Sequence, residues 1–271
     1  MRPLRGRMGI KMKITHDLHI HSHLSSCAND SATVKHYVNK AKELGLTMIG
    51  FTDHMWDSAV DGANGWYQKQ NFEHILNLKN EIASEDTGDL KILFGCETEY
   101  DLAHKGVAIS EEVAKQLDFL LVPNSHTHIT MPKDYFDPYQ KHADYMVEAF
   151  YDIVNSNVAE YITAIAHPFF AVGCPYDDRE LFGLISDTKF EDMFRIAKSK
   201  NIALEINLAC FRNKKISELF TDPSLRMYRI AKEIGCKFTV GSDSHSSSGH
   251  DNFELLYVLT SLMDLKNEDF A

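Results

Sequence analysis

The sequence predicts a closed parallel α/β barrel, because seven short apolar or β-branched runs alternate with longer helical patterns along its 271 residues. No repeat, low-complexity tract or linker interrupts this alternation. We therefore expect a single barrel domain over residues 13–271, preceded by a flexible basic arm at 1–12. An open doubly wound sheet is the alternative, and the lack of a GxGxxG motif after the first run weakens it.

The expected strands are runs too short for helices and rich in β-branched or apolar residues. They are 14–21, 47–54, 92–99, 119–126, 162–168, 203–209 and 238–245. Apolar stripes with a 3.6-residue period between them indicate helices. One stripe ends before Gly45, where glycine suits a helix C-terminus. Two others begin after Asp222-Pro223 and at Asp187, residues that favour helix starts.

Composition excludes several classes of protein. No apolar run approaches the roughly 20 residues that span a bilayer, and the basic N-terminus lacks the apolar core of a secretion signal. Five cysteines without CxxC spacing predict neither a disulfide framework nor a zinc finger, and they favour a reducing, cytoplasmic location. A formal net charge of −11 argues against a general nucleic-acid binder. Nothing in the sequence specifies an oligomeric state.

Six of the seven expected strands end in side chains that commonly bind metal ions. These are His19 and His21; Asp53 and His54; Glu97 and Glu99; His126 and His128; His167; and Asp243 and His245. Strand C-termini of a parallel barrel open on one face, so these side chains should converge. Any one alone is more often a capping residue, but burying so many imidazoles and carboxylates together without metal would cost desolvation and repulsion. The joint pattern therefore predicts a metal centre.

The first run, HDLHIHSH, indicates which of its side chains face that centre, because residues two apart on a strand point the same way. We expect His19 and His21 to face the barrel axis. Leu18 and Ile20 should then pack outward against helices. Asp17 shares the parity of the two histidines but lies deeper, so we expect it to hydrogen-bond a ligating histidine. Asp53, in the second run, is expected to support a ligand in the same way.

Imidazoles mixed with carboxylates suit zinc, manganese or iron better than magnesium or calcium. The candidate ligands exceed what one ion can use, so we expect two or three divalent ions, with Glu97 as the natural bridge. Closely spaced ions would share a hydroxide of lowered pKa and would neutralise charge on a phosphoryl group during in-line attack.

The ordered motifs resemble those of the polymerase-and-histidinol-phosphatase (PHP) superfamily. They are DLHIHS, FTDH, GCETEY, NSH, AHP and GSDSH, spread over residues 14 to about 250. The resemblance implies a distorted seven-stranded barrel that binds up to three metals and hydrolyses phosphoesters. By motif, it implies one ion on His19, His21, Glu97 and Asp243, a second on Glu97, His126 and His167, and a third near His54 and His245.

Two positions depart from the family pattern. Many histidinol-phosphatase-type members carry a histidine eight residues after the first motif histidine, where this chain has Cys27. Cys27 is either a thiolate ligand or a small buried cysteine, in which case the third ion would be weak or absent. An extra residue in VPNSHTHI makes His126 and His128 rival ligands, and we favour His126, next to Ser125.

Expected substrate contacts lie outside the cluster. Asn207 should orient groups in the pocket, and Arg212 on the following loop should bind phosphate. His23 lies past the first strand, where it should contact substrate or be exposed. The long loop 55–70, which carries Trp56 and Trp66, could close over a small substrate or act as a structural plug.

The favoured function is metal-dependent hydrolysis of a small phosphomonoester, with L-histidinol phosphate as the leading substrate and a role in histidine biosynthesis. A metal-bridging hydroxide would attack phosphorus, and Asp243 or His245 would assist protonation of the leaving alkoxide. One alternative is a phosphodiesterase or exonuclease with the same metals. Another is a non-catalytic metal-binding barrel, which the many retained ligands count against.

Overall fold

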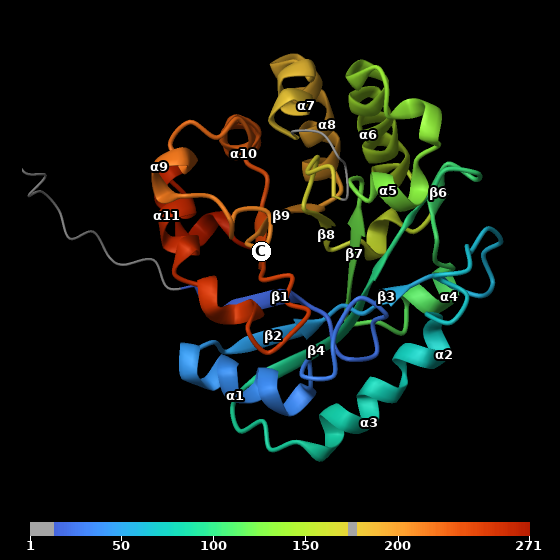
Figure 1. Cartoon of the computed structure of the whole chain (residues 1–271), viewed down its shortest axis with the longest axis vertical. Helices are drawn as coiled ribbons and strands as arrows, with labels where there is room; N and C mark the ends of the chain where they lie inside the picture. The colour runs from blue at the N-terminus through green and yellow to red at the C-terminus, as the bar shows by residue number, and fades with distance from the viewer. Residues whose placement is uncertain (1–13, 173–177) are drawn as a thin grey trace, which may run out of the picture.

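The computed structural model describes residues 14–172 and 178–271, so the expected arm at 1–12 lies outside the described residues. Seven parallel strands form one continuous path that curves into a nearly closed barrel with helices around it (Figure 1). They are β1 (His16–Ile20), β2 (Met48–Phe51), β4 (Lys91–Thr98), β7 (Phe119–Pro123), β8 (Ala164–Ala166), β9 (Ala203–Asn207) and β10 (Phe238–Gly241). The expected barrel is confirmed.

The second expected strand is divided in two. Its first part is β2, and its end forms the short strand β3 (His54–Met55), which pairs with β4 so that His54 lies opposite Glu97. A separate antiparallel pair, β5 (Tyr100–Asp101) with β6 (Gly106–Val107), follows β4. The division places His54 directly beside Glu97.

The barrel closes between β1 and the segment after β10. The backbone N–H of His21 donates to the carbonyl of Ser244 over 2.9 Å, and the N–H of Asp243 donates to the carbonyl of His19 over 2.8 Å. Ile20 and Ser244 form an isolated parallel bridge here. Residues from opposite ends of the chain are thereby held side by side.

Helices cover the outside of the strands (Figure 1). They are α1 (Val34–Leu44), α2 (Phe72–Ile75), α3 (Asn77–Ser84), α4 (Glu111–Ala114), α5 (Thr127–Thr130), α6 (Tyr139–Val154), α7 (Asp178–Leu184), α8 (Asp187–Ser199), α9 (Ile216–Leu219), α10 (Ser224–Ile234) and α11 (Leu255–Leu262), with 3-10 turns at Lys133–Tyr135, Ala159–Tyr161, Gly249–Asn252 and Asn267–Asp269. Gly45 ends α1 with φ 70°, as predicted. Helix α8 starts at Asp187, but Ser186 is the residue that caps it. Within the described ranges, no helix is long and apolar enough to cross a bilayer.

The directions of the side chains in β1 differ from one prediction. The pairing register with β2 shifts between Asp17 and Ile20. Leu18 packs with Phe119 and Leu121 in a cluster made only of strand residues, so it faces the barrel interior. The prediction that Leu18 packs outward is wrong, whereas Ile20 does join the larger cluster that includes helix side chains. An irregularity of this kind changes which side chains face inward and cannot be read from a two-residue period.

Two glycines make room for the ring of Phe119. A Cβ on Gly50 would lie 2.4 Å from Cζ of Phe119, and one on Gly95 would lie 2.6 Å from Cε1 of the same ring. Both contacts are far inside van der Waals distance, so larger residues would displace the ring. The Phe119 ring thereby packs with Leu18 and Leu121 in the cluster of strand residues.

Candidate metal centre

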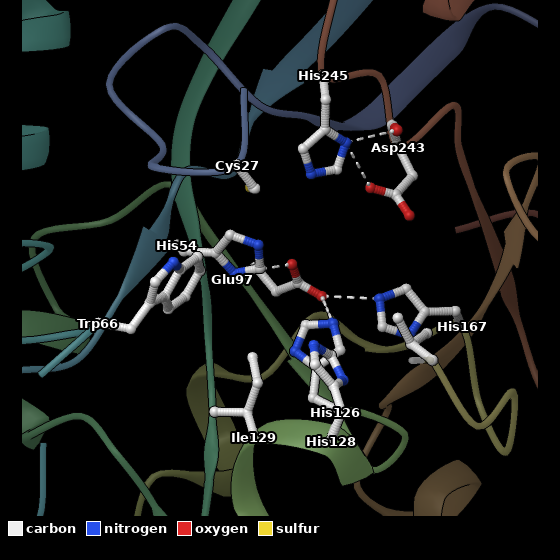
Figure 2. A pocket seen from close by; sticks show the side chains of 11 residues that line it. Cys27, His54, Trp66, Glu97, His126, His128, Ile129, His167, Asp243 and His245 are labelled. Carbon is white, nitrogen blue, oxygen red and sulfur yellow. Dashed lines mark hydrogen bonds and ion pairs between the residues drawn. The ribbon is translucent and has the colours of Figure 1, made fainter. Parts of the chain in front are cut away.

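The carboxyl ends of the strands surround a pocket of about 390 Å³. Figure 2 shows Glu97 at its centre, with imidazoles pointing toward it from several strand ends. The lining residues are Cys27, His54, Trp66, Glu97, His126, His128, Ile129, His167, Val172, Asp243 and His245. His19 and His21 are fully buried next to Glu97. The structure thus brings the expected strand-end residues together.

Four ligand atoms face one another at the first expected ion position. Nε2 of His19 and Nε2 of His21 lie 3.0 Å apart, and each lies 3.4 Å from Oε2 of Glu97. Oδ1 of Asp243 lies 3.6 Å from the first nitrogen and 3.5 Å from the second. Donor atoms about 2.1 Å from a tetrahedral zinc ion lie about 3.4 Å from one another. The chemistry and spacing of this set therefore fit a zinc-sized ion.

The second oxygen of Glu97 faces a different pair of imidazoles. Oε1 lies 2.9 Å from Nε2 of His167 and 3.6 Å from Nε2 of His126. A carboxylate with one oxygen toward each histidine set has the position of a bridging ligand. This geometry agrees with the bridging role expected for Glu97.

A third group lies on the outer side of the pocket. His21, Cys27, His54 and His245 each offer a donor atom within 4.8 Å of the others. The His21 ring stacks against His54 and His245, with centroids 4.5 and 4.1 Å away. Nδ1 of His54 is buried without a hydrogen bond and lies 3.3 Å from Oε2 of Glu97.

Close packing of these charges shifts their pKa values. Burial opposes ionisation of Glu97 and Asp243, but the neighbouring histidines hold the pKa of both carboxyls well below the usual range. Burial disfavours protonation of His19, yet nearby carboxylates outweigh it and raise its pKa well above the ordinary value. At His54 burial dominates and the pKa lies well below that value, and burial lowers the pKa of His245 to about 4. Neutral imidazoles of this kind have the lone pair that metal binding needs.

The outward nitrogens of two histidines are held by carboxylates. Nδ1 of His19 lies 2.7 Å from Oε1 of Glu205, and Nδ1 of His126 lies 2.6 Å from Oε1 of Glu99. The hydroxyl of Tyr67 donates to the same Glu99 oxygen. Partners of this kind fix the ring orientation, so that Nε2 of each histidine points at Glu97.

Serine hydroxyls hold two more rings. Oγ of Ser125 lies 2.6 Å from Nδ1 of His167, and Oγ of Ser25 lies 3.2 Å from Nδ1 of His21. Ser25 also donates to Asp53 over 2.8 Å. Asp53 therefore supports His21 through Ser25, in line with its expected supporting position.

Sequence reasoning missed Glu205. This buried residue of β9 holds His19 with Oε1, and its Oε2 accepts from the N–H of His167 over 2.7 Å and from Nδ2 of Asn207 over 3.1 Å. The available signal was an acidic residue inside an otherwise apolar strand, two positions before Asn207 and so on the same face.

We expect Glu205→Gln to lower zinc affinity by about 10- to 100-fold, because an amide holds the His19 ring less firmly than a carboxylate. Competition with a chelator of known affinity measures the change. Unchanged affinity would show that Glu205 does not position His19.

Asp17 hydrogen-bonds a ligating histidine as predicted, but it contacts the backbone of that residue and not its ring. One carboxylate oxygen accepts from the backbone N–H of His19 over 3.2 Å and from that of Ser242 over 2.9 Å, and the other lies 2.6 Å from Nε2 of His250. The register shift in β1 separates Asp17 from the inward face. Its contact with a ligating histidine is therefore through the backbone.

The expected substrate residues lie at different distances from the pocket. His23 does not line it, and its Nε2 lies 3.4 Å from Oε1 of Glu81 on α3. Asn207 donates to Oδ2 of Asp243 over 3.2 Å, so it orients a carboxylate. Arg212 is exposed, and its Nη2 donates to the Asp243 carbonyl over 3.4 Å. Neither Asn207 nor Arg212 is among the described residues that line the pocket.

The two tryptophans of loop 55–70 have different positions. Trp66 lines the pocket, with its ring centroid 5.1 Å from that of His54. Trp56 is buried and packs against Tyr67, with centroids 5.8 Å apart. The loop is thus both a wall of the pocket and a structural plug.

His126 and His128 both line the pocket, but His126 Nε2 approaches Glu97 and His128 is exposed. We expect His126→Ala to lose bound metal and His128→Ala to keep the metal content of the unmodified protein. Elemental analysis of the two purified variants decides between them. Metal loss in His128→Ala alone would reverse the assignment.

Known proteins are similar to most of this chain. The sequence model of the PHP domain matches residues 17–209. This chain belongs to the PHP domain family. A probable phosphatase from Photobacterium profundum is 25% identical over 234 residues, which cover 86% of this chain and 80% of that protein. Another probable phosphatase, from Thermoanaerobacter sp., is 26% identical over 238 residues, which cover 88% of this chain and 82% of that protein.

Two solved structures show the same fold as this PHP domain. Histidinol phosphate phosphatase from Lactococcus lactis, complexed with zinc, L-histidinol and phosphate, superposes with a TM-score of 0.67 at 22% identity, covering 95% of this chain and 94% of that one. A putative histidinol phosphatase from Listeria monocytogenes superposes with a TM-score of 0.62 at 16% identity, covering 90% and 100%.

Proposed function

We propose that this PHP domain is a metal-dependent phosphomonoesterase that acts on a small phosphorylated metabolite, with L-histidinol phosphate as the leading candidate and histidine biosynthesis as the corresponding pathway. The observation that carries the proposal is the Glu97 carboxylate, whose two oxygens face separate sets of imidazoles. We propose two or three divalent ions in these sets: zinc, manganese or iron.

The relatives support this chemistry. Curated proteins similar to most of this chain are named probable phosphatases. The Lactococcus lactis protein with the same fold is a histidinol phosphate phosphatase with zinc, L-histidinol and phosphate bound. Bound divalent ions would supply an activated water and neutralise the charge that builds on phosphorus.

The pocket suits a small substrate. Its volume of about 390 Å³ is in the range of small-molecule sites. Trp66, Ile129 and Val172 add apolar surface to a lining that is otherwise mostly polar. Among its described lining residues there is no lysine or arginine to follow a nucleic-acid backbone.

The chain's own residues would bind and orient the ester. Arg212 would contact the phosphate from the rim beside Asp243, and Glu97 would hold the two ion positions together. Nδ1 of His245 lies 3.0 Å from the Asp243 carbonyl, and its ring lines the pocket. We propose that Asp243 or His245 assists protonation of the leaving alkoxide by orienting the water molecule that delivers the proton.

A substrate comparison tests this function. Metal-reconstituted protein is assayed for phosphate release from L-histidinol phosphate, other phosphometabolites and p-nitrophenyl phosphate, alongside the diester bis(p-nitrophenyl) phosphate. We expect hydrolysis of monoesters, fastest with L-histidinol phosphate. Cleavage of the diester alone would indicate a phosphodiesterase, and no hydrolysis with zinc, manganese or iron would indicate a non-catalytic barrel.

A further inference from the structure

Cys27 is placed differently from the other described cysteines. Cys96 and Cys236 are buried in the main hydrophobic cluster. Cys27 is exposed to solvent and lines the pocket. Figure 2 shows its side chain pointing into the pocket between His54 and His245. It is not a packing residue of the core.

Three imidazoles surround the thiol. His21, His54 and His245 each have a ring nitrogen within 4.8 Å of the Cys27 sulfur and of one another. Because Nε2 of His21 already faces the first ion position, the sulfur and the rings of His54 and His245 offer three donors to this outer position, the number of protein ligands in many zinc sites that keep one position open.

A ring nitrogen of His54 gives an independent indication of an ion here. The residue is only 6% exposed, and Nδ1 makes no hydrogen bond. Leaving a buried polar nitrogen without a partner is energetically unfavourable. Its nearest charged neighbour is Glu97, at 3.3 Å, which two ion positions would also share. An ion in the pocket would complete this environment.

We propose that Cys27 gives the outermost ion position of this centre a thiolate ligand, shared with His54 and His245, so that this position selects zinc-like ions over manganese. The proposal rests on the metal centre proposed above but not on the identity of the substrate.

Binding of the ion by Cys27 releases one proton. When the ion binds, the thiol proton of Cys27 passes to solvent and the sulfur lone pair forms the bond to the metal. Thiolates favour soft or borderline ions such as zinc and cobalt, whereas manganese favours oxygen ligands. The histidine that the family pattern places at this position would not make that distinction as strongly.

Cobalt substitution tests directly whether the Cys27 sulfur binds the ion. Metal-stripped protein is titrated with Co²⁺, and the near-ultraviolet thiolate-to-cobalt charge-transfer band is recorded together with the number of ions bound. We expect the band in the unmodified protein and its loss in Cys27→Ser, with affinity for the weakest-bound ion falling at least about tenfold. Cys27→His should bind the ion without the band. Cys210→Ser, on the loop after β9, is the matched control and should keep it.

Alkylation tests the same ligand without a mutation. Iodoacetamide modifies a free thiol, with loss of iodide and a proton, and mass spectrometry follows each cysteine. Zinc should slow modification of Cys27 relative to manganese loaded to the same stoichiometry, and leave Cys210 unaffected. The proposal would be overturned by a charge-transfer band that persists in Cys27→Ser, or by the lack of a band in the unmodified protein. Equal protection of Cys27 by zinc and manganese would also overturn it. Phosphatase activity enters none of these readouts, so failure here is distinct from failure of the proposed function.

Discussion

Glu97→Gln should lower kcat/KM for phosphomonoesters by about 10³-fold or more, because it removes the charge that two ion positions share. Oε2 faces His19 and His21, and Oε1 faces His126 and His167. The amide keeps the shape but offers only one weakly coordinating oxygen. Steady-state kinetics after metal reconstitution measures the loss of activity, and elemental analysis of the same samples measures the loss of bound metal.

Glu43→Gln is the matched control, because Glu43 is an exposed glutamate on α1 that pairs with Lys40. Its activity and metal content should equal those of the unmodified protein. If Glu97→Gln kept its bound ions and most of its activity, Glu97 would not be a bridging ligand.

Asp243→Asn should lower kcat/KM by about 10²- to 10³-fold through the loss of one charged ligand. Asp243 follows β10 with φ 53°, and Oδ1 lies 3.6 Å from His19 Nε2. Asparagine adopts the left-handed region readily, so the backbone should tolerate the change. Kinetics gives the loss of activity, and thermal unfolding of the metal-free protein shows whether the fold is preserved.

Asp264→Asn is the control for the left-handed backbone conformation. Asp264 also has a left-handed backbone, with φ 52°, but it pairs with Lys232 away from the pocket. We expect full activity and little change in Tm for this variant. Equal losses of activity in both variants would mean that the backbone conformation, and not ligation by Asp243, explains the effect.

The strand-end residues were predictable because parallel strands end on one face and because alternate side chains point the same way. Those two geometric rules hold for β4, β7 and β10, so Glu97, His126 and Asp243 could be placed together before any coordinates. The rules fail at β1, where the register shift turns Leu18 inward and moves Asp17 away from the ligand rings. Such an irregularity depends on how β1 fits its neighbours.

The supporting residues were harder to predict. Glu205 stood out as an acid in an apolar strand, but its partner His19 is 186 positions away in the sequence. His23 lies beside Glu81 of α3, a contact that local sequence does not specify. These contacts depend on tertiary packing, whereas the ligand pattern follows from strand topology.

The most direct test of the central claim is a zinc titration of chelator-stripped protein, with phosphomonoesterase activity and bound metal measured on the same samples. The metal-free protein should be inactive, and activity should return as the second ion binds and reach a plateau by about three ions per chain. Full monoesterase activity in protein shown to contain no metal would contradict the account.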